Sequence, residues 1–210
     1  MAALALAPRR RRLAALRVAA QHIGEGEFST PVEAVRWMLA LQAQDFPGLK
    51  WSVGLRHVGA TMSGVNAALD AGEIVRIWPL RGTLHLVAGE DLGWLLALTT
   101  PRMMASAASR RAALGLTEAD SERAREIVTA ALSGHRALSR RALLATLDAA
   151  GVSTAGQRGY HLLGYLAQTG TLVLGPTDGA QQAFALLDEW VVHPARRLER
   201  DEALGELALR

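Results

Sequence analysis

The order of helix and hairpin signals most restricts the fold of this chain of 210 residues, because the same order occurs twice. In the first half, apolar residues at helical spacing predict helices over 30–41, 49–56 and 63–71. Alternating apolar and polar residues then predict a β-hairpin over 74–87, with turn residues between its strands. Three short helices followed by a hairpin indicate a helix-turn-helix with a β-wing.

The second half repeats this order. Helices are predicted from Thr117, from Ser139 and from a capping box at 154–157, and a second hairpin follows over 172–186. A parallel α/β sheet would need buried β-branched strands between the helices, and the sequence lacks them. The predicted fold class is therefore mainly α with small β-hairpins, built as tandem winged-helix (helix-turn-helix) modules.

These signals divide the chain into four segments. We expect a first winged-helix module with an N-terminal helix at 1–88, and a connector of two helices, separated before Pro101, at 89–116. The second module is expected at 117–192. An amphipathic pattern near the C-terminus predicts the start of a further, truncated element at 193–210.

Composition excludes several classes of protein. No apolar stretch is long enough to span a bilayer, and the short apolar start precedes its arginines, which is the reverse of a secretory signal. A cytoplasmic protein is therefore expected. The chain has no cysteine, and its six histidines are scattered without ligand spacing, so we expect no metal site. A P-loop is also lacking, and we expect no nucleotide cofactor.

Double-stranded DNA is the expected partner. The formal net charge is +3, and the basic residues are arginines except for Lys50. Arginine makes bidentate contacts with phosphates and base edges. A GC-rich genome, which favours arginine and alanine codons, would produce the same bias, so composition alone supports DNA only weakly.

The third helix of the second module carries one set of candidate DNA contacts. Gln157, Arg158 and His161 begin a polar stripe on the face opposite Leu162 and Leu163. Glutamine and arginine are the side chains that pair with purine edges. A solvated helix face would show the same pattern, and the two interpretations are equally supported.

The first hairpin carries a second set of candidate contacts, Arg76, Arg81 and His85. Arg81 lies at the turn, where it could anchor a phosphate. Alternation places Arg76 and His85 on one face together with Trp78, which we expect to be a packing residue. The opposite face should be more buried, and it carries Val75, Ile77, Leu84 and Leu86.

The loop after the first predicted helix is the most unusual feature. It reads Gln42-Ala43-Gln44-Asp45 before a Phe-Pro-Gly turn, and by itself it is typical of a helix end with polar caps. Together with other motifs, it resembles the bacterial winged-helix DNA-binding family of the AlkZ/YcaQ type. The resemblance runs from about Arg10 to the last residue, and its motifs are Leu41–Gly48, Val75–Val87, Gly156–Arg158, His161–Leu163 and Leu186–Trp190.

This resemblance implies a function. Characterised members of the family are DNA glycosylases that excise bulky N-alkylated purines, including crosslinks. Their catalytic motif falls on Gln42 and Gln44 here. Both side chains should therefore face a solvent-open concavity beside the first wing, within reach of Arg81, rather than the core. Asp45 would help electrostatically or, as we rather expect, cap the next helix. Family members continue through a third winged helix and a β-domain, which this sequence does not contain.

Three interpretations follow. The first is a monofunctional DNA glycosylase, a hydrolase of DNA repair, in its full-length form. The 210 residues by themselves are expected to be weak or inactive, because the missing modules should complete the cleft. The second is a non-catalytic winged-helix DNA-binding protein, such as a regulator, and excision of an alkylated base would separate the two. The third is a protein-interaction scaffold, for which association would be insensitive to salt and DNA would not bind.

Overall fold

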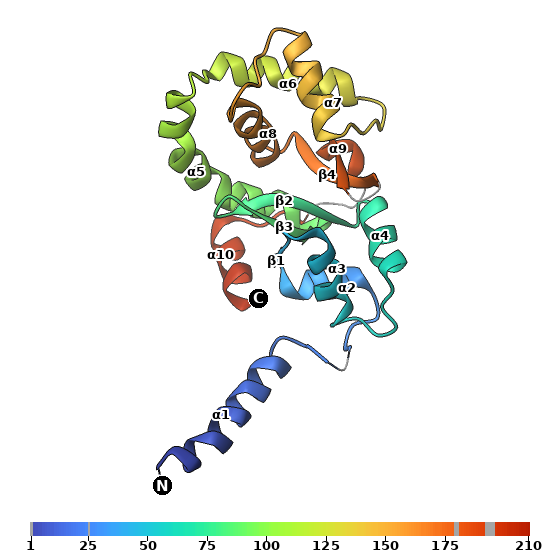
Figure 1. Cartoon of the computed structure of the whole chain (residues 1–210), viewed down its shortest axis with the longest axis vertical. Helices are drawn as coiled ribbons and strands as arrows, with labels where there is room; N and C mark the ends of the chain where they lie inside the picture. The colour runs from blue at the N-terminus through green and yellow to red at the C-terminus, as the bar shows by residue number, and fades with distance from the viewer. Residues whose placement is uncertain (1, 25, 179–180, 192–195) are drawn as a thin grey trace.

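The computed structural model describes residues 2–24, 26–178, 181–191 and 196–210, and His193 lies outside these ranges. The chain is mainly helical around one small antiparallel sheet, as Figure 1 shows. Its helices are α1 (Ala2–Ala19), α2 (Pro31–Met38), α3 (Phe46–Gly54), α4 (Met62–Asp70), α5 (Gly89–Ala113), α6 (Glu118–Leu132), α7 (Arg140–Ala149), α8 (Arg158–Gln168), α9 (Leu187–Trp190) and α10 (Arg200–Leu209). Its strands are β1 (Leu41–Gln42), β2 (Ile74–Leu80), β3 (Thr83–Ala88), β4 (Leu172–Asp178) and β5 (Gln181–Leu186).

The predicted fold class is confirmed. Helices α2 to α4 precede the hairpin β2–β3, and α6 to α8 precede the hairpin β4–β5. Local capping explains several helix starts. The hydroxyl of Thr30 accepts from the Glu33 amide, and Thr117 and Asp120 cap each other reciprocally. No helix in the described ranges combines the length and apolar character of a membrane span.

Two local predictions are wrong. The connector is one helix, α5, that continues through Pro101 and curves around the left side of Figure 1. The proline costs one backbone hydrogen bond, but the first turns of α5 are held by buried leucines, so the helix bends rather than ends. The capping box at Thr154 does not form, because Thr154 donates to the Asp148 carboxylate instead and α8 begins at Arg158.

The two hairpins join in one sheet, which the sequence did not predict. The strand order is β1-β3-β2-β4-β5, with all pairs antiparallel. Strands β2 and β4 meet where Arg76 lies opposite Leu174. The residues just after α2 form β1, which pairs with β3. The two halves of the chain therefore share one β-structure.

The register of the first hairpin differs from the expected one. Ile77 pairs with His85, and Arg76 pairs with Leu86. The register shifts just after Ile77, in the segment that contains Pro79. Proline has no amide hydrogen for the ladder, and a bulge is a position where a strand tolerates it. A shift of one residue moves side chains to the other face, so Ile77 shares its face with His85 and Arg76 shares its face with Leu86.

The expected burial pattern is therefore wrong in part. Val75, Ile77 and Leu86 are fully buried, but His85 is only 3% exposed and Arg76 only 9%, whereas Leu84 is half-buried. The reason is that the sheet is covered on both faces.

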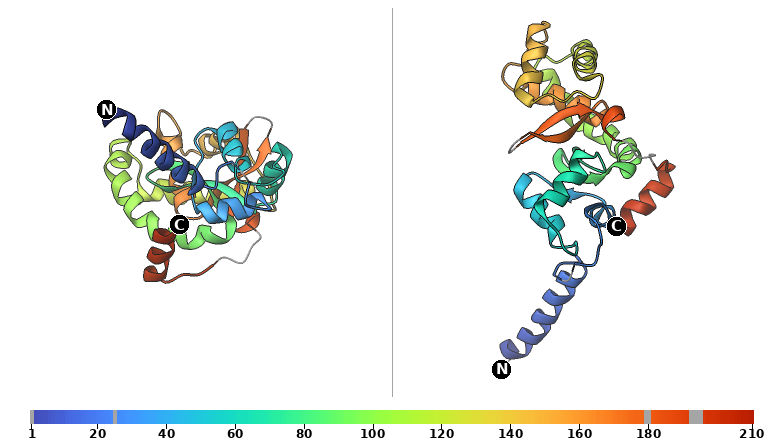
Figure 2. Two further views of the ribbon diagram at one scale, coloured as in Figure 1. Left: turned by 90° about the horizontal axis from the view of Figure 1, so that it is seen from below. Right: turned by 90° about the vertical axis from the view of Figure 1, so that its right-hand side faces the viewer.

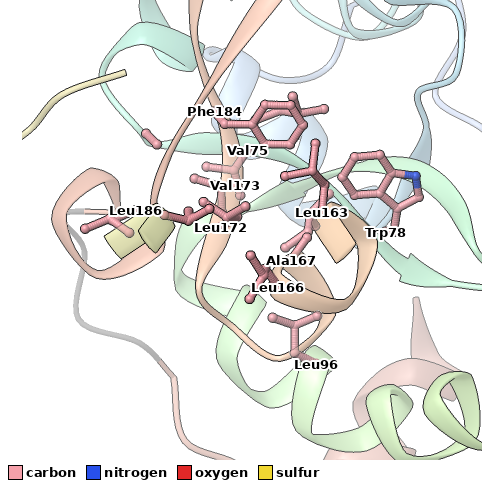
Figure 3. Packing of buried hydrophobic residues seen from close by; sticks show 14 of the residues in the cluster. Val75, Trp78, Leu96, Leu163, Leu166, Ala167, Leu172, Val173, Phe184 and Leu186 are labelled. Atoms are coloured by element: carbon pink, nitrogen blue, oxygen red, sulfur yellow. The ribbon is translucent and has the colours of Figure 1, made fainter. Parts of the chain in front are cut away.

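One face of the sheet packs on the core of the second half. In Figure 3, Val75 and Trp78 pack with Leu163, Val173 and Phe184. The indole of Trp78 stacks at 6.5 Å between ring centroids on Phe184, so the expectation that Trp78 is a packing residue is confirmed. The other face packs on a separate first-half cluster that includes Ala34, Val35, Leu49, Val53, Leu69, Ile74 and Leu86.

The predicted helix near the C-terminus is confirmed as α10, which packs on α5. Asp91 of α5 is fully buried, and its carboxylate accepts from Trp94, Arg196 and Arg210. A buried carboxylate requires such partners, so these contacts fix residues 196–210 to α5. At the other end of the chain, α1 points away from the rest of the molecule (Figures 1 and 2).

Alanine substitutions at Gly72 and at Gly170 test how closely Trp190 of the second half packs on the first half. Gly72 and Gly170 both have positive φ, 69° and 80°, but a Cβ on Gly72 would lie 2.1 Å from the Trp190 carbonyl oxygen, whereas one on Gly170 would meet nothing within 4 Å. Gly170→Ala should cost about 1–2 kcal/mol for the left-handed backbone. Gly72→Ala should cost about 1–3 kcal/mol more, measured by urea unfolding. Equal losses would contradict this packing of Trp190 on Gly72.

The buried His85 predicts a pH dependence of stability. Burial lowers the pKa of His85, a hydrogen bond to the Thr83 carbonyl opposes this shift, and the charge of Arg81 adds to it. The unfolded chain therefore takes up a proton that the folded chain excludes. The stabilisation is present above the ordinary pKa of histidine and is lost as the pH falls through it toward the lowered pKa of the folded state.

We expect the unfolding free energy of the chain to fall between pH 7.5 and pH 5 more steeply than that of His85→Gln. Chemical denaturation at a series of pH values measures both. His161 is present in both proteins, so the difference between the slopes isolates His85. Parallel curves would show that the imidazole titrates normally in the fold.

Candidate functional site

The loop of the two glutamines begins as an edge strand. Leu41 pairs with Leu86, Gln42 pairs with His85, and the Ala43 amide donates to the Leu84 carbonyl at 2.8 Å. Successive side chains of a strand point to opposite faces. Leu41 and Ala43 are accordingly buried, and both glutamines are exposed. The expectation that Gln42 and Gln44 face solvent rather than the core is confirmed, but neither glutamine lines a cavity found among the described residues, so the expected concavity within reach of Arg81 is not confirmed.

The two exposed amides form a pair. Gln42 Nε2 donates to Gln44 Oε1 at 2.9 Å. This bond orients both side chains and directs the remaining polar atoms outward, namely the carbonyl oxygen of Gln42 and the NH2 group of Gln44. A neutral amide is too weak a base to take a proton from water, but its carbonyl oxygen can orient a water molecule or stabilise a nearby cation.

The buried side chain of Arg76 holds the backbone of this loop through two hydrogen bonds. Its Nε donates to the Ala43 carbonyl at 2.5 Å, and its Nη2 donates to the Gln44 carbonyl at 3.0 Å. Burial lowers the pKa of Arg76, the charge of Arg140 lowers it further and Asp45 opposes the shift, yet a guanidinium stays protonated at neutral pH. Arg76 was predicted as a DNA contact. The structure places it as a buried support for the backbone between the two glutamines.

Asp45 follows the loop and occupies the N-cap position of α3. Its side chain makes no capping hydrogen bond among the described residues, although its carbonyl accepts from the Leu49 amide. The expected side-chain cap is therefore not formed. The exposed carboxylate instead lies beside the backbone of Gly48.

Arg81 and His85, the other two predicted DNA contacts of the first hairpin, lie in different environments. Arg81 is exposed at the turn, with φ 53°, and Gly82 follows with φ 69°. Two successive residues with positive φ give the tight turn typical of a two-residue hairpin. His85 is buried beside Ile77 because of the register shift, and its Nδ1 donates to the Thr83 carbonyl at 2.9 Å. It does not lie on an open surface.

The second set of predicted residues lies at the start of α8. The side-chain oxygen of Gln157 accepts from Arg110 at 2.7 Å. The guanidinium of Arg158 donates to the carbonyl oxygens of Ser153, Leu114 and Gly115 at 3.0, 2.7 and 2.9 Å, so it joins α8 to the end of α5.

His161, one turn along, is half-buried. Burial lowers its pKa, and the charges of Arg110 and Arg111 on α5 lower it further.

The turn after Trp78 and the exposed face of α8 meet at a small cavity of about 120 Å³, which is lined by Trp78, Gly82, Met103 and His161 among others. The structure thus brings the turn of Arg81 toward α8, while Gln42, Gln44 and Arg76 form a separate group.

Sequence reasoning missed Arg140 and Phe46. Both line a groove that also includes Arg76, and the ring of Phe46 lies 5.4 Å below the Arg76 guanidinium. Arg140 begins α7, more than sixty residues away in the chain. Its only sequence signal is its place beside Arg141 after the Ser139 cap, which is also typical of an ordinary helix start.

Comparisons with known proteins identify the fold and the family of the chain. No curated protein gives a significant match. Among solved structures, the chain is similar to the DNA glycosylase AlkZ of Streptomyces sahachiroi, with a TM-score of 0.72 and 24% identity over 89% of this chain. The chain spans 52% of the length of that relative. A family model described as DNA glycosylase AlkZ-like matches residues 35–210, and the chain therefore belongs to the AlkZ-like DNA glycosylase family.

Proposed function

We propose that the chain is part of a monofunctional DNA glycosylase, a cytoplasmic repair hydrolase that in its full-length form cleaves the N-glycosidic bond of alkylated, including crosslinked, purines in double-stranded DNA. The observation that carries the proposal is the solvent-facing pair of Gln42 and Gln44, whose backbone is fixed by a buried arginine. Membership of the family supports the same class of reaction.

The chemistry requires little from the protein. A purine alkylated on a ring nitrogen is positively charged and is a good leaving group, so the glycosidic bond breaks toward an oxocarbenium-like cation. The carbonyl oxygen of Gln42 and the second lone pair of the Gln44 carbonyl oxygen would stabilise that cation and accept hydrogen bonds from the attacking water. The cationic base leaves as a neutral molecule, water adds its oxygen to the sugar carbon and releases a proton to solvent, and the strand is not cleaved.

DNA would be held by two winged-helix modules, 1–88 and 117–192, joined by the connector 89–116. Arg81 at the hairpin turn and the start of α8 with Gln157 and His161 are the surfaces proposed to face the duplex. A phosphate contact by Arg158 would compete with its three backbone carbonyls. Positive side chains gain most of their DNA affinity from phosphates and counterion release.

The first prediction concerns the excision rate. In the full-length protein, Gln44→Ala should lower excision of an N7-alkylguanine from duplex DNA by about 10²–10³-fold, because the lost contact acts in the transition state. Affinity for the same duplex should change little. Release of the alkylated base under single-turnover conditions measures the rate, and fluorescence anisotropy measures the affinity.

Gln21→Ala is the matched control, since Gln21 is an exposed glutamine outside this loop, and it should excise like the unchanged chain. Full excision by Gln44→Ala would contradict the catalytic role. If the unchanged full-length protein binds duplex DNA but leaves the lesion intact, the non-catalytic DNA-binding interpretation stands instead.

The second prediction concerns Arg81. Its replacement by alanine should weaken binding and reduce the slope of log affinity against log salt by about one unit, as expected for one lost phosphate contact. The matched control is Arg123→Ala, because Arg123 is an exposed arginine that pairs with Glu126 on α6. A slope equal to that of Arg123→Ala would remove Arg81 from the DNA-binding surface.

A further inference from the structure

A groove of about 390 Å³ lies where the two hairpins meet, and its lining includes Phe46, two residues after Gln44. Arg76 forms one side of it while also holding the Gln44 carbonyl at 3.0 Å. The groove therefore borders the loop that carries the proposed catalytic pair. Its lining comes from both halves of the chain and consists of Phe46, Arg76, Leu84, Arg140, Leu174, Gln181, Gln182 and Phe184.

The walls of the groove are built by the fold. Leu138, just before α7, exchanges backbone hydrogen bonds with Phe184 of β5 at 3.0 and 2.8 Å. This bridge places Arg140 at the groove, with its guanidinium carbon 5.9 Å from the centre of the Phe184 ring. On the floor, Gln182 is 7% exposed and donates to the Gly175 carbonyl at 3.0 Å.

The charge of the groove has one sign. Arg76 and Arg140 are its charged residues, and among the described residues that line it there is no carboxylate. The two cations are close enough for Arg140 to help lower the pKa of Arg76. Asp45, the acid that opposes this effect, is not part of the lining. Two like charges that line one groove favour an anion between them.

We infer that this groove binds one phosphodiester of the DNA strand under repair, with Arg140 as its main contact. The inference rests on the proposed function. It gives the proposed glycosylase a site for the sugar–phosphate backbone of DNA at the loop that carries Gln42 and Gln44. The alkylated base itself is a poor occupant, because it is cationic and both guanidiniums would repel it. A phosphate held here would fix the register of the strand over Gln42 and Gln44.

The test compares two neighbouring arginines at the start of α7. Both Arg140 and Arg141 are exposed, but only Arg140 lines the groove. The whole chain, Arg140→Gln, Arg140→Lys and Arg141→Gln are titrated against an undamaged fluorescent duplex at several salt concentrations. Arg140→Gln should bind about tenfold more weakly and lose about one unit of salt slope. Arg140→Lys should keep the slope, and Arg141→Gln should resemble the unchanged chain.

The outcomes separate this inference from the function. Equal affinity and slope for Arg140→Gln and Arg141→Gln would overturn the phosphate site while leaving DNA binding intact. An unchanged chain that does not bind duplex DNA would overturn both. Excision by Arg140→Gln should show a raised KM with a nearly unchanged kcat, because the lost contact positions the strand and is not made only in the transition state. A fall in kcat alone would assign Arg140 to the chemical step instead.

Discussion

The candidate site depends on a buried charge that is satisfied by backbone. The guanidinium of Arg76 donates to the carbonyl oxygens of Ala43 and Gln44, and a buried cation without such acceptors would be strongly destabilising. The shift of register near Pro79 places Arg76 on the face that carries Leu86 and the loop. Without this shift the side chain would point to the opposite face, and the loop of the glutamines would lose its support.

Much of the fold could be predicted from local signals. The capping residues Thr30, Thr117 and Ser139 begin real helices because a side-chain oxygen satisfies an amide within the same turn. The union of the two hairpins could not be predicted, since it depends on contacts between residues about one hundred positions apart. The shifted register was missed because alternation alone assumes an unbroken strand, and the continuation of α5 through Pro101 reflects tertiary packing.

The site was predictable to a different degree. From residue types alone, Gln42 and Gln44 were interpreted as polar caps at an ordinary helix end. The resemblance to a family was what identified them as candidate catalytic residues. Alternation along the edge strand then explains why both are exposed. The alternation pattern predicted an open face for Arg76 and His85. It could not show that residues from distant segments of the chain pack over both faces of the sheet. Arg140 gave no distinct signal, since its neighbours in the groove come from other parts of the chain.

The joined sheet has a mechanical consequence. Because β2 pairs with β4, the two halves of the chain cannot change their relative tilt without breaking backbone hydrogen bonds and opening the core that Val75 shares with Val173 and Phe184. In the proposed complex with DNA, the protein would then be the stiff member, and the duplex would have to deform to fit it. Duplexes that are already weakened pay a smaller deformation energy, so stiffness in the sheet would favour damaged segments before any base is read.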